Sequence, residues 1–167
     1  MREWLAISQN HSKKTILDDE TAIFRDQDIP GFESVEQPKS PEQIAILELV
    51  NTETNEVLKR YGLESFDIPP KNYHVIKESE WKSKGVAFYR PNLQFVAMVE
   101  QPANIVFMTK AFHETLHFKS YNALQITIGD TKEQKDYRIG LAVTSRDGKR
   151  EFFRHLNEAV TEELTRQ

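Results

Sequence analysis

Two histidines and one glutamate form the most informative pattern in the sequence: His113, Glu114 and His117, in the order H-E-x-x-H. On an α-helix, residues four apart lie on one face, so both imidazoles can point at the same metal ion. Glu114 can reach a water molecule on that ion without binding the ion itself. The spacing therefore predicts two metal ligands and a general base on a helix. The alternative is a surface helix with two unrelated histidines.

A second pair with helical spacing, Glu158 and Glu162, lies near the C-terminus. One carboxylate can join two histidines around a zinc ion and leave a fourth coordination position open. The other can accept the free ring N–H of a ligating histidine, which fixes the tautomer of that ring. Taken alone, the pair would be a solvated acidic face of a terminal helix. The chain has no cysteine, so any metal must be held by His, Asp or Glu.

Together, His-Glu-Thr-Leu-His at 113–117 and Asn-Glu-Ala-Val-Thr-Glu at 157–162 resemble the gluzincins, the thermolysin-like family of zinc metallopeptidases. That family follows H-E-x-x-H with Asn-Glu-x-x-Ser/Thr-Asp/Glu on a second helix. The resemblance covers roughly residues 70–167 and implies one zinc ion held by His113, His117 and Glu158. It also implies that Glu162 binds the ring of His113 and that Glu114 is the general base and acid.

Other classes of zinc peptidase match the sequence less well. A metzincin continues as H-E-x-x-H-x-x-G-x-x-H, but Ser120 and Ala123 stand at the glycine and third histidine positions. An inverted H-x-x-E-H pattern is absent. The resemblance thus implies a small zincin-like α+β domain. Its parts would be a short twisted, mostly antiparallel sheet, a backing helix, the H-E-x-x-H helix and a C-terminal glutamate helix.

The resemblance implies hydrolysis of a peptide or protein substrate. Zinc lowers the pKa of a bound water to about 7, and Glu114 takes its proton and then hands it to the leaving amine. An extended substrate is expected to add as a further strand along an edge strand. The residues expected in that strand are Val86, Ala87, Phe88 and Tyr89. Two of them, Phe88 and Tyr89, can equally be ordinary core and surface members of an edge strand.

The residue that stabilises the tetrahedral oxyanion has no obvious counterpart in this sequence. In larger gluzincins it comes from a helical subdomain beyond the glutamate helix, and this sequence has five residues after Glu162. His155 and Tyr137 are the candidates for this role here. His155 precedes Glu158 by three residues, so it can lie near the metal or face solvent in the first turn of the helix.

The elements that position these residues follow from apolar periodicity and from residues that begin or end elements. Ser40, Pro41 and Gln43 form an N-terminal capping signal, and Gly62 ends the same scaffold helix. Strands are expected at 73–76, 85–90 and 93–99. A helix that starts at Pro102 then carries H-E-x-x-H, as the metal motif requires.

The C-terminal part of the chain predicts a mixture of short strands and one helix. We expect a strand at 124–128, a polar loop at 129–135 and a strand at 137–144. Asp147-Gly148 is typical of a hairpin turn, so residues 150–153 are expected to pair back. A last helix, which carries the two glutamates, is expected from about His155.

Length and charge limit the remaining possibilities. The 167 residues suit one domain, which we place at 41–167, preceded by an irregular arm at 1–40 that drapes over it or covers the cleft. The net charge of −4 and the lack of a basic stripe argue against nucleic-acid binding. No signal peptide or membrane-length apolar run is visible, which favours a cytoplasmic protein without a membrane contact.

Three functions therefore remain open at the level of sequence. The first is a zinc-dependent endopeptidase. The second is a non-catalytic zincin-like domain, in which a structural zinc ion joins two helices of an interaction or regulatory module. The third is an interaction domain whose histidines bind no metal.

Overall fold

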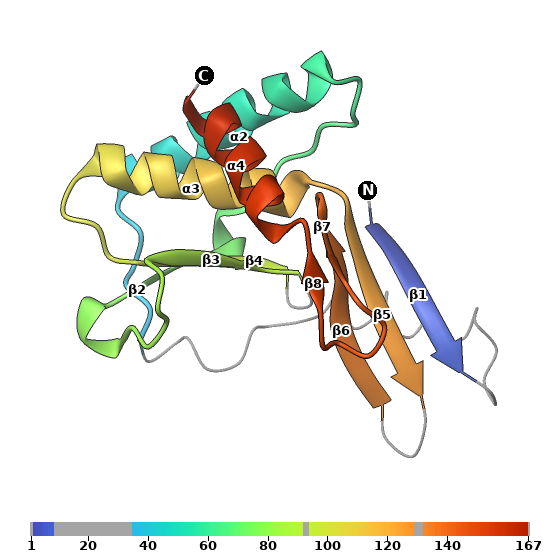
Figure 1. Cartoon of the computed structure of the whole chain (residues 1–167). Helices are drawn as coiled ribbons and strands as arrows, with labels where there is room; N and C mark the ends of the chain where they lie inside the picture. The colour runs from blue at the N-terminus through green and yellow to red at the C-terminus, as the bar shows by residue number, and fades with distance from the viewer. Residues whose placement is uncertain (1, 9–34, 92–93, 129–131, 167) are drawn as a thin grey trace. The chain divides into compact units, whose positions relative to one another are not determined.

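The computed structural model describes residues 2–8, 35–91, 94–128 and 132–166, which form an α+β fold (Figure 1). Within these residues lie three α-helices and two small mixed sheets. The chain divides into two compact units. One holds the N-terminal strand and Ser120–Ala159, and the other holds residues 35–90, 94–119 and 160–166.

The second unit is built on a three-stranded sheet in the order β2 (Tyr73–Ile76), β4 (Phe95–Val99), β3 (Ala87–Arg90). Strand β4 runs parallel to β2 and antiparallel to β3, and all five of its residues are buried. Helix α3 (Asn104–Lys119) packs against β3 and β4 and against helix α2 (Pro41–Arg60) (Figure 1). The strands and helix predicted for 73–119 are thus confirmed, with ends shifted by a few residues.

Helix α2 begins and ends where the sequence predicts. The Ser40 hydroxyl accepts a bond from the Gln43 backbone N–H at 3.2 Å, and the Gln43 side chain accepts one from the Ser40 N–H at 2.9 Å. Gly62 follows the helix with a φ of +66°. The buried Asn51 side chain donates to the Ile68 carbonyl and accepts from the Ile68 N–H, both at 2.9 Å. These bonds hold the segment after α2 against the helix.

The first unit contains a five-stranded sheet in the order β1, β5, β6, β7, β8. Its strands are β1 (Arg2–Ser8), β5 (Asn122–Ile128), β6 (Lys132–Ile139), β7 (Ala142–Thr144) and β8 (Glu151–Phe152). β1 is parallel to β5, and the other pairs are antiparallel. Helix α4 (Arg154–Arg166) follows β8.

Several expectations for these parts were wrong. The segment 1–40 is not irregular throughout, because residues 2–8 form β1; residues 9–34 lie outside the described part of the chain. Residues 132–135 belong to β6 rather than to a polar loop, and 129–131 are not described. The strand expected at 137–144 is divided by a turn at Gly140, where φ is +56°. One sheet was expected, whereas the described residues form two, although most of their strand pairs are antiparallel.

The turn at Gly140 is fixed by its contact with the start of α4. The buried Asn157 side chain accepts a hydrogen bond from the Leu141 N–H at 2.8 Å. A Cβ atom at residue 140 would collide with that same side-chain oxygen of Asn157. Glycine is therefore required here for two reasons: the left-handed backbone conformation and the close approach of the Asn157 side chain.

Replacing Gly140 with alanine is expected to destabilise the protein more than the same change at Gly62. Both glycines have positive φ, so each alanine costs about 1 kcal/mol of backbone strain. An added Cβ at residue 62 meets nothing within 4 Å, whereas at residue 140 it meets Asn157 and adds about 1–3 kcal/mol. Urea denaturation of the two variants measures the difference in unfolding free energy. Equal losses would show that the Asn157 contact is unimportant.

Candidate metal centre

Helix α3 carries the H-E-x-x-H residues and is anchored on its opposite side. Phe107, Ala111 and Thr115 are fully or almost fully buried at helical spacing. The hydroxyls of Thr115 and Tyr73 lie 2.8 Å apart and share a hydrogen bond that joins α3 to β2. Burial raises the pKa of Tyr73 to about 12, so the phenol stays neutral and available for that bond. The rotation of α3 about its axis is thereby fixed.

The C-terminal end of α3 is held by a buried lysine. Lys119 is 2% exposed, and its ammonium donates to the Asn51 carbonyl at 3.1 Å and to the Asn55 side-chain oxygen at 2.7 Å. Burial lowers the pKa of Lys119 to about 8, against the opposing effect of the Asp67 carboxylate. This tie between α3 and α2 lies two residues beyond His117. Nothing in the local sequence marks Lys119 as buried.

The two imidazoles of α3 meet at one point. The Nε2 atoms of His113 and His117 are 3.1 Å apart, and the rings are tilted by 73° with centroids 4.8 Å apart. Two nitrogens that bind one tetrahedral zinc ion at about 2.0–2.1 Å lie about 3.3 Å from each other. The pair therefore fits a shared ion. The same distance also fits an N–H···N hydrogen bond between two neutral rings.

A third donor comes from α4. One ligand atom each from His113, His117 and Glu158 can be chosen so that all three lie within 4.8 Å of one another. His117 is 7% exposed, His113 is half-buried and Glu158 is exposed. Two imidazole nitrogens and one carboxylate oxygen are donors that zinc accepts readily. This group, whose members the sequence named as candidate ligands, could hold a metal ion.

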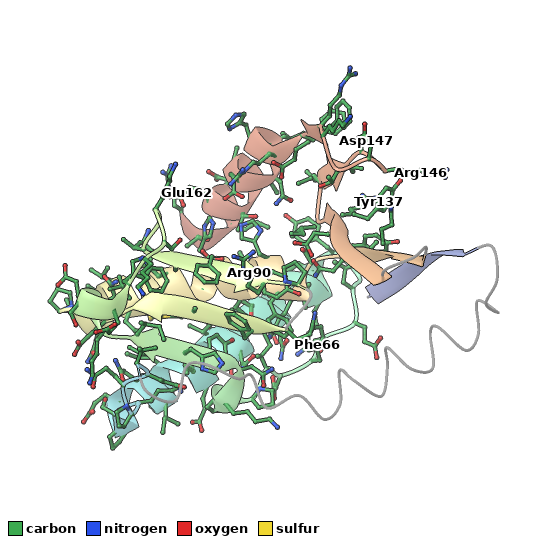
Figure 2. All side chains as sticks on the ribbon, turned by 90° about the horizontal axis from the view of Figure 1, so that it is seen from below. Phe66, Arg90, Tyr137, Arg146, Asp147 and Glu162 are labelled. Atoms are coloured by element: carbon green, nitrogen blue, oxygen red, sulfur yellow. The ribbon has the colours of Figure 1, made fainter. Side chains whose placement is uncertain are left out.

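Glu162 contacts the other nitrogen of the first histidine. Its Oε2 lies 3.6 Å from Nδ1 of His113, while its Oε1 accepts from the Arg166 guanidinium at 3.2 Å (Figure 2 labels Glu162 on α4). A carboxylate at this position favours the proton on Nδ1 and directs the lone pair of Nε2 towards His117 and the third donor. Arg166 was not identified from the sequence as a partner of Glu162. Its position four residues further along the helix is nevertheless typical of an ion pair.

Replacing Glu162 with alanine is expected to weaken zinc binding by about 10- to 100-fold. The reason is that the His113 ring would lose the carboxylate that orients it. The dissociation constant is measured by competition with a chromogenic chelator. Glu163→Ala removes an exposed carboxylate from the neighbouring position and is the control. If the two variants bind zinc equally well, Glu162 has no role in orienting the ligand.

The other predicted site residues are not members of the group of three that could share an ion. Glu114 is half-buried on α3, between His113 and His117 in the sequence. His155 lies exposed in the first turn of α4 and is not a member of the three-ligand group. Tyr137 is half-buried on β6 in the first unit (Figure 2). The catalytic role of Glu114 and the stabilising roles of His155 and Tyr137 therefore stay predictions.

The predicted substrate strand is an edge strand of its sheet. β3 holds Ala87, Phe88 and Tyr89, and Val86 directly precedes it and accepts a bond from the Val99 N–H at 2.9 Å. The Tyr89 ring is buried and lies 4.9 Å from the ring of Phe118 on α3. On the other face, the Phe88 ring lies 5.5 Å from Trp81. Side chains of β3 are thus used in packing, and among the described strands β3 pairs with β4 alone and lies at the edge of its sheet.

Comparisons with known proteins do not identify a family. We found no match to the chain among protein-family models, curated proteins or solved structures. The gluzincin resemblance therefore rests on the residues and spacings of the two motifs. Within the described residues, no helix combines the length and the apolar character needed to cross a membrane.

Proposed function

We propose that this chain is a zinc-dependent peptidase domain of the gluzincin type. The observation that supports the proposal is the convergence of His113, His117 and Glu158, with ligand atoms within 4.8 Å of one another. Two further residues support the proposal. Glu114 directly follows the first histidine on α3, and Glu162 approaches its Nδ1 at 3.6 Å.

Each residue has a distinct task in the proposed reaction. His113, His117 and Glu158 would hold the ion, which supplies Lewis acidity and makes water nucleophilic near neutral pH. The Glu114 carboxylate accepts a proton from the attacking water and returns it to the nitrogen of the leaving amine. Glu162 keeps the proton of His113 on Nδ1. The reaction consumes one water and one peptide bond and yields a carboxylate and an amine.

The edge of β3 is the proposed position of an extended substrate. Backbone groups of residues 86–90 would pair with the substrate backbone as a neighbouring strand does. Because this pairing uses backbone groups, it gives affinity for many sequences, and pockets alongside the strand decide which side chains are accepted. Phe88 and Tyr89 contribute to the core as well, since both pack against aromatic rings on opposite faces of the sheet.

A structural ion is the second candidate function. It is favoured by the burial of His117, which is 7% exposed, and by the origin of the ligands in two helices, α3 and α4. An ion in such a group would join those helices and stabilise the fold without reacting. In that case the chain is an interaction or regulatory module.

Cleavage of a peptide library separates the two candidates. The protein is incubated with the library, and new termini are identified by mass spectrometry. The peptidase proposal expects cleavage that stops on addition of a chelator and returns with stoichiometric zinc. A zinc-loaded, folded protein that cleaves nothing in the library would favour the structural ion.

A further inference from the structure

A concave surface lies among the helices of the second unit. Its volume is about 300 Å³, and α2, the middle of α3 and the end of α4 form its walls. The lining is mainly apolar: Leu49, Val50, Val57, Met108, Phe112 and Leu164. Val50 and Val57 form a buried floor, whereas Leu49 on the rim is 47% exposed. The groove thus offers an apolar surface of the size at which ligand pockets begin.

Two opposite charges stand on the same wall of the groove. Glu53 and Arg60 both line it and are both exposed on α2. They are seven residues apart, which corresponds to about 10.5 Å along the helix axis. Three residues of extended chain span about 10–11 Å. The groove therefore has a negative and a positive group at the separation of the two ends of a tripeptide.

From this arrangement we propose that the groove binds a short apolar peptide with free ends. The ammonium group of the peptide lies by Glu53 and its carboxylate by Arg60. Its aliphatic side chains fill the surface between α2 and α3. This site is separate from the proposed reaction, because none of His113, Glu114, His117 and Glu158 lines it.

Binding is tested with Leu-Leu-Leu by isothermal titration or by NMR shifts, with a chelator present throughout. The chelator removes any bound ion. Binding of the peptide carboxylate to a metal therefore cannot be mistaken for binding in the groove. Saturable binding with a dissociation constant below about 1 mM is expected. The same peptide with an acetylated amine and an amidated carboxylate is expected to bind at least about fivefold more weakly, because it lacks both charges.

Charge reversal on the rim tests the orientation of the peptide. Arg60→Glu is expected to weaken binding of Leu-Leu-Leu by roughly fivefold or more, through repulsion of its carboxylate. Glu53→Arg combined with Arg60→Glu restores the affinity, because the peptide then binds in the reverse direction with the same side chains. Lys59→Glu makes the same charge change one residue away, outside the groove, and is the matched control.

Three results would overturn the proposal. The first is no binding of Leu-Leu-Leu up to millimolar concentration by a folded protein. The second is equal binding of the free and blocked peptides. The third is a double variant that binds as weakly as Arg60→Glu alone. Because all measurements are made without metal, each of these results leaves the proposed peptidase function untouched.

Discussion

Glu114→Gln is expected to lower the rate of peptide-bond hydrolysis by about 100- to 10,000-fold while zinc and fold are retained. The amide has the shape of the carboxylate but cannot accept the proton of the attacking water. Glu114 is half-buried on α3 and is not one of the three predicted ligands, so its loss should not disturb the ion. The measurement is the initial rate of cleavage of the best library peptide, with zinc content determined on the same sample.

Glu163→Gln is the matched control for this experiment, since it makes the same change at an exposed position of α4. It should cleave at the wild-type rate. If Glu114→Gln and wild type cleave equally fast, the activity does not depend on this carboxylate and the assigned mechanism is wrong. If neither cleaves but both bind zinc, the structural ion becomes the better account.

Glu158→Ala has the second large expected effect, a loss of zinc affinity of at least about 100-fold. The variant removes the only carboxylate of the three-ligand group and leaves the two imidazoles of α3. The loss should exceed that of Glu162→Ala, because Glu162 contacts a ligand ring rather than the ion. Zinc should raise the thermal midpoint of the wild type but hardly that of Glu158→Ala, since stabilisation follows the affinity of the folded state.

Two further variants serve as controls for Glu158→Ala. Glu163→Ala should keep the full zinc-dependent shift, because its side chain is exposed and outside the group. His117→Ala should lose the shift, because it removes a buried candidate ligand. A Glu158 variant with wild-type zinc affinity would remove this residue from the ligand set and leave a site made by the two histidines alone.

Elements with strong local signals were predictable from the sequence. The Ser40–Gln43 capping box marks the start of α2, and the apolar run at 73–76 coincides with β2. Helix α3 follows from apolar residues at helical spacing, and the spacing of His113 and His117 then places both rings on one face. In these segments the local preference for helix or strand agrees with the final fold, so the sequence pattern alone is sufficient to predict the element.

Elements defined by distant partners were not predictable in this way. The first five residues of β6 (Lys132–Ile139), at 132–136, are all polar and carry no apolar alternation, so their strand form depends on pairing with β5. β1 pairs with β5 across more than a hundred residues of sequence. The apolar run Trp4-Leu5-Ala6-Ile7 is consistent with a strand. The polar and acidic residues that follow it led to the expectation that the whole segment is irregular.

The candidate metal ligands were more predictable than the residues that support them. Three candidate ligands follow from two motifs with fixed spacing, whereas Lys119 and Asn51 support α3 through bonds between segments far apart in the sequence. No periodicity distinguishes a buried lysine from a solvated one, because burial depends on what packs against it. Sequence patterns identify chemistry more readily than the contacts that position it.

The most direct test of the central claim is the metal content and coordination of the purified protein. The protein is stripped with a chelator, reloaded with zinc, and examined by elemental analysis and X-ray absorption. The account predicts one zinc ion per chain with two imidazole nitrogens at about 2.0–2.1 Å and a carboxylate oxygen. In Glu158→Ala, the carboxylate contribution should be lost. A folded protein that binds no stoichiometric zinc, or a zinc ion whose ligands are unchanged in His113→Ala and His117→Ala, would contradict it.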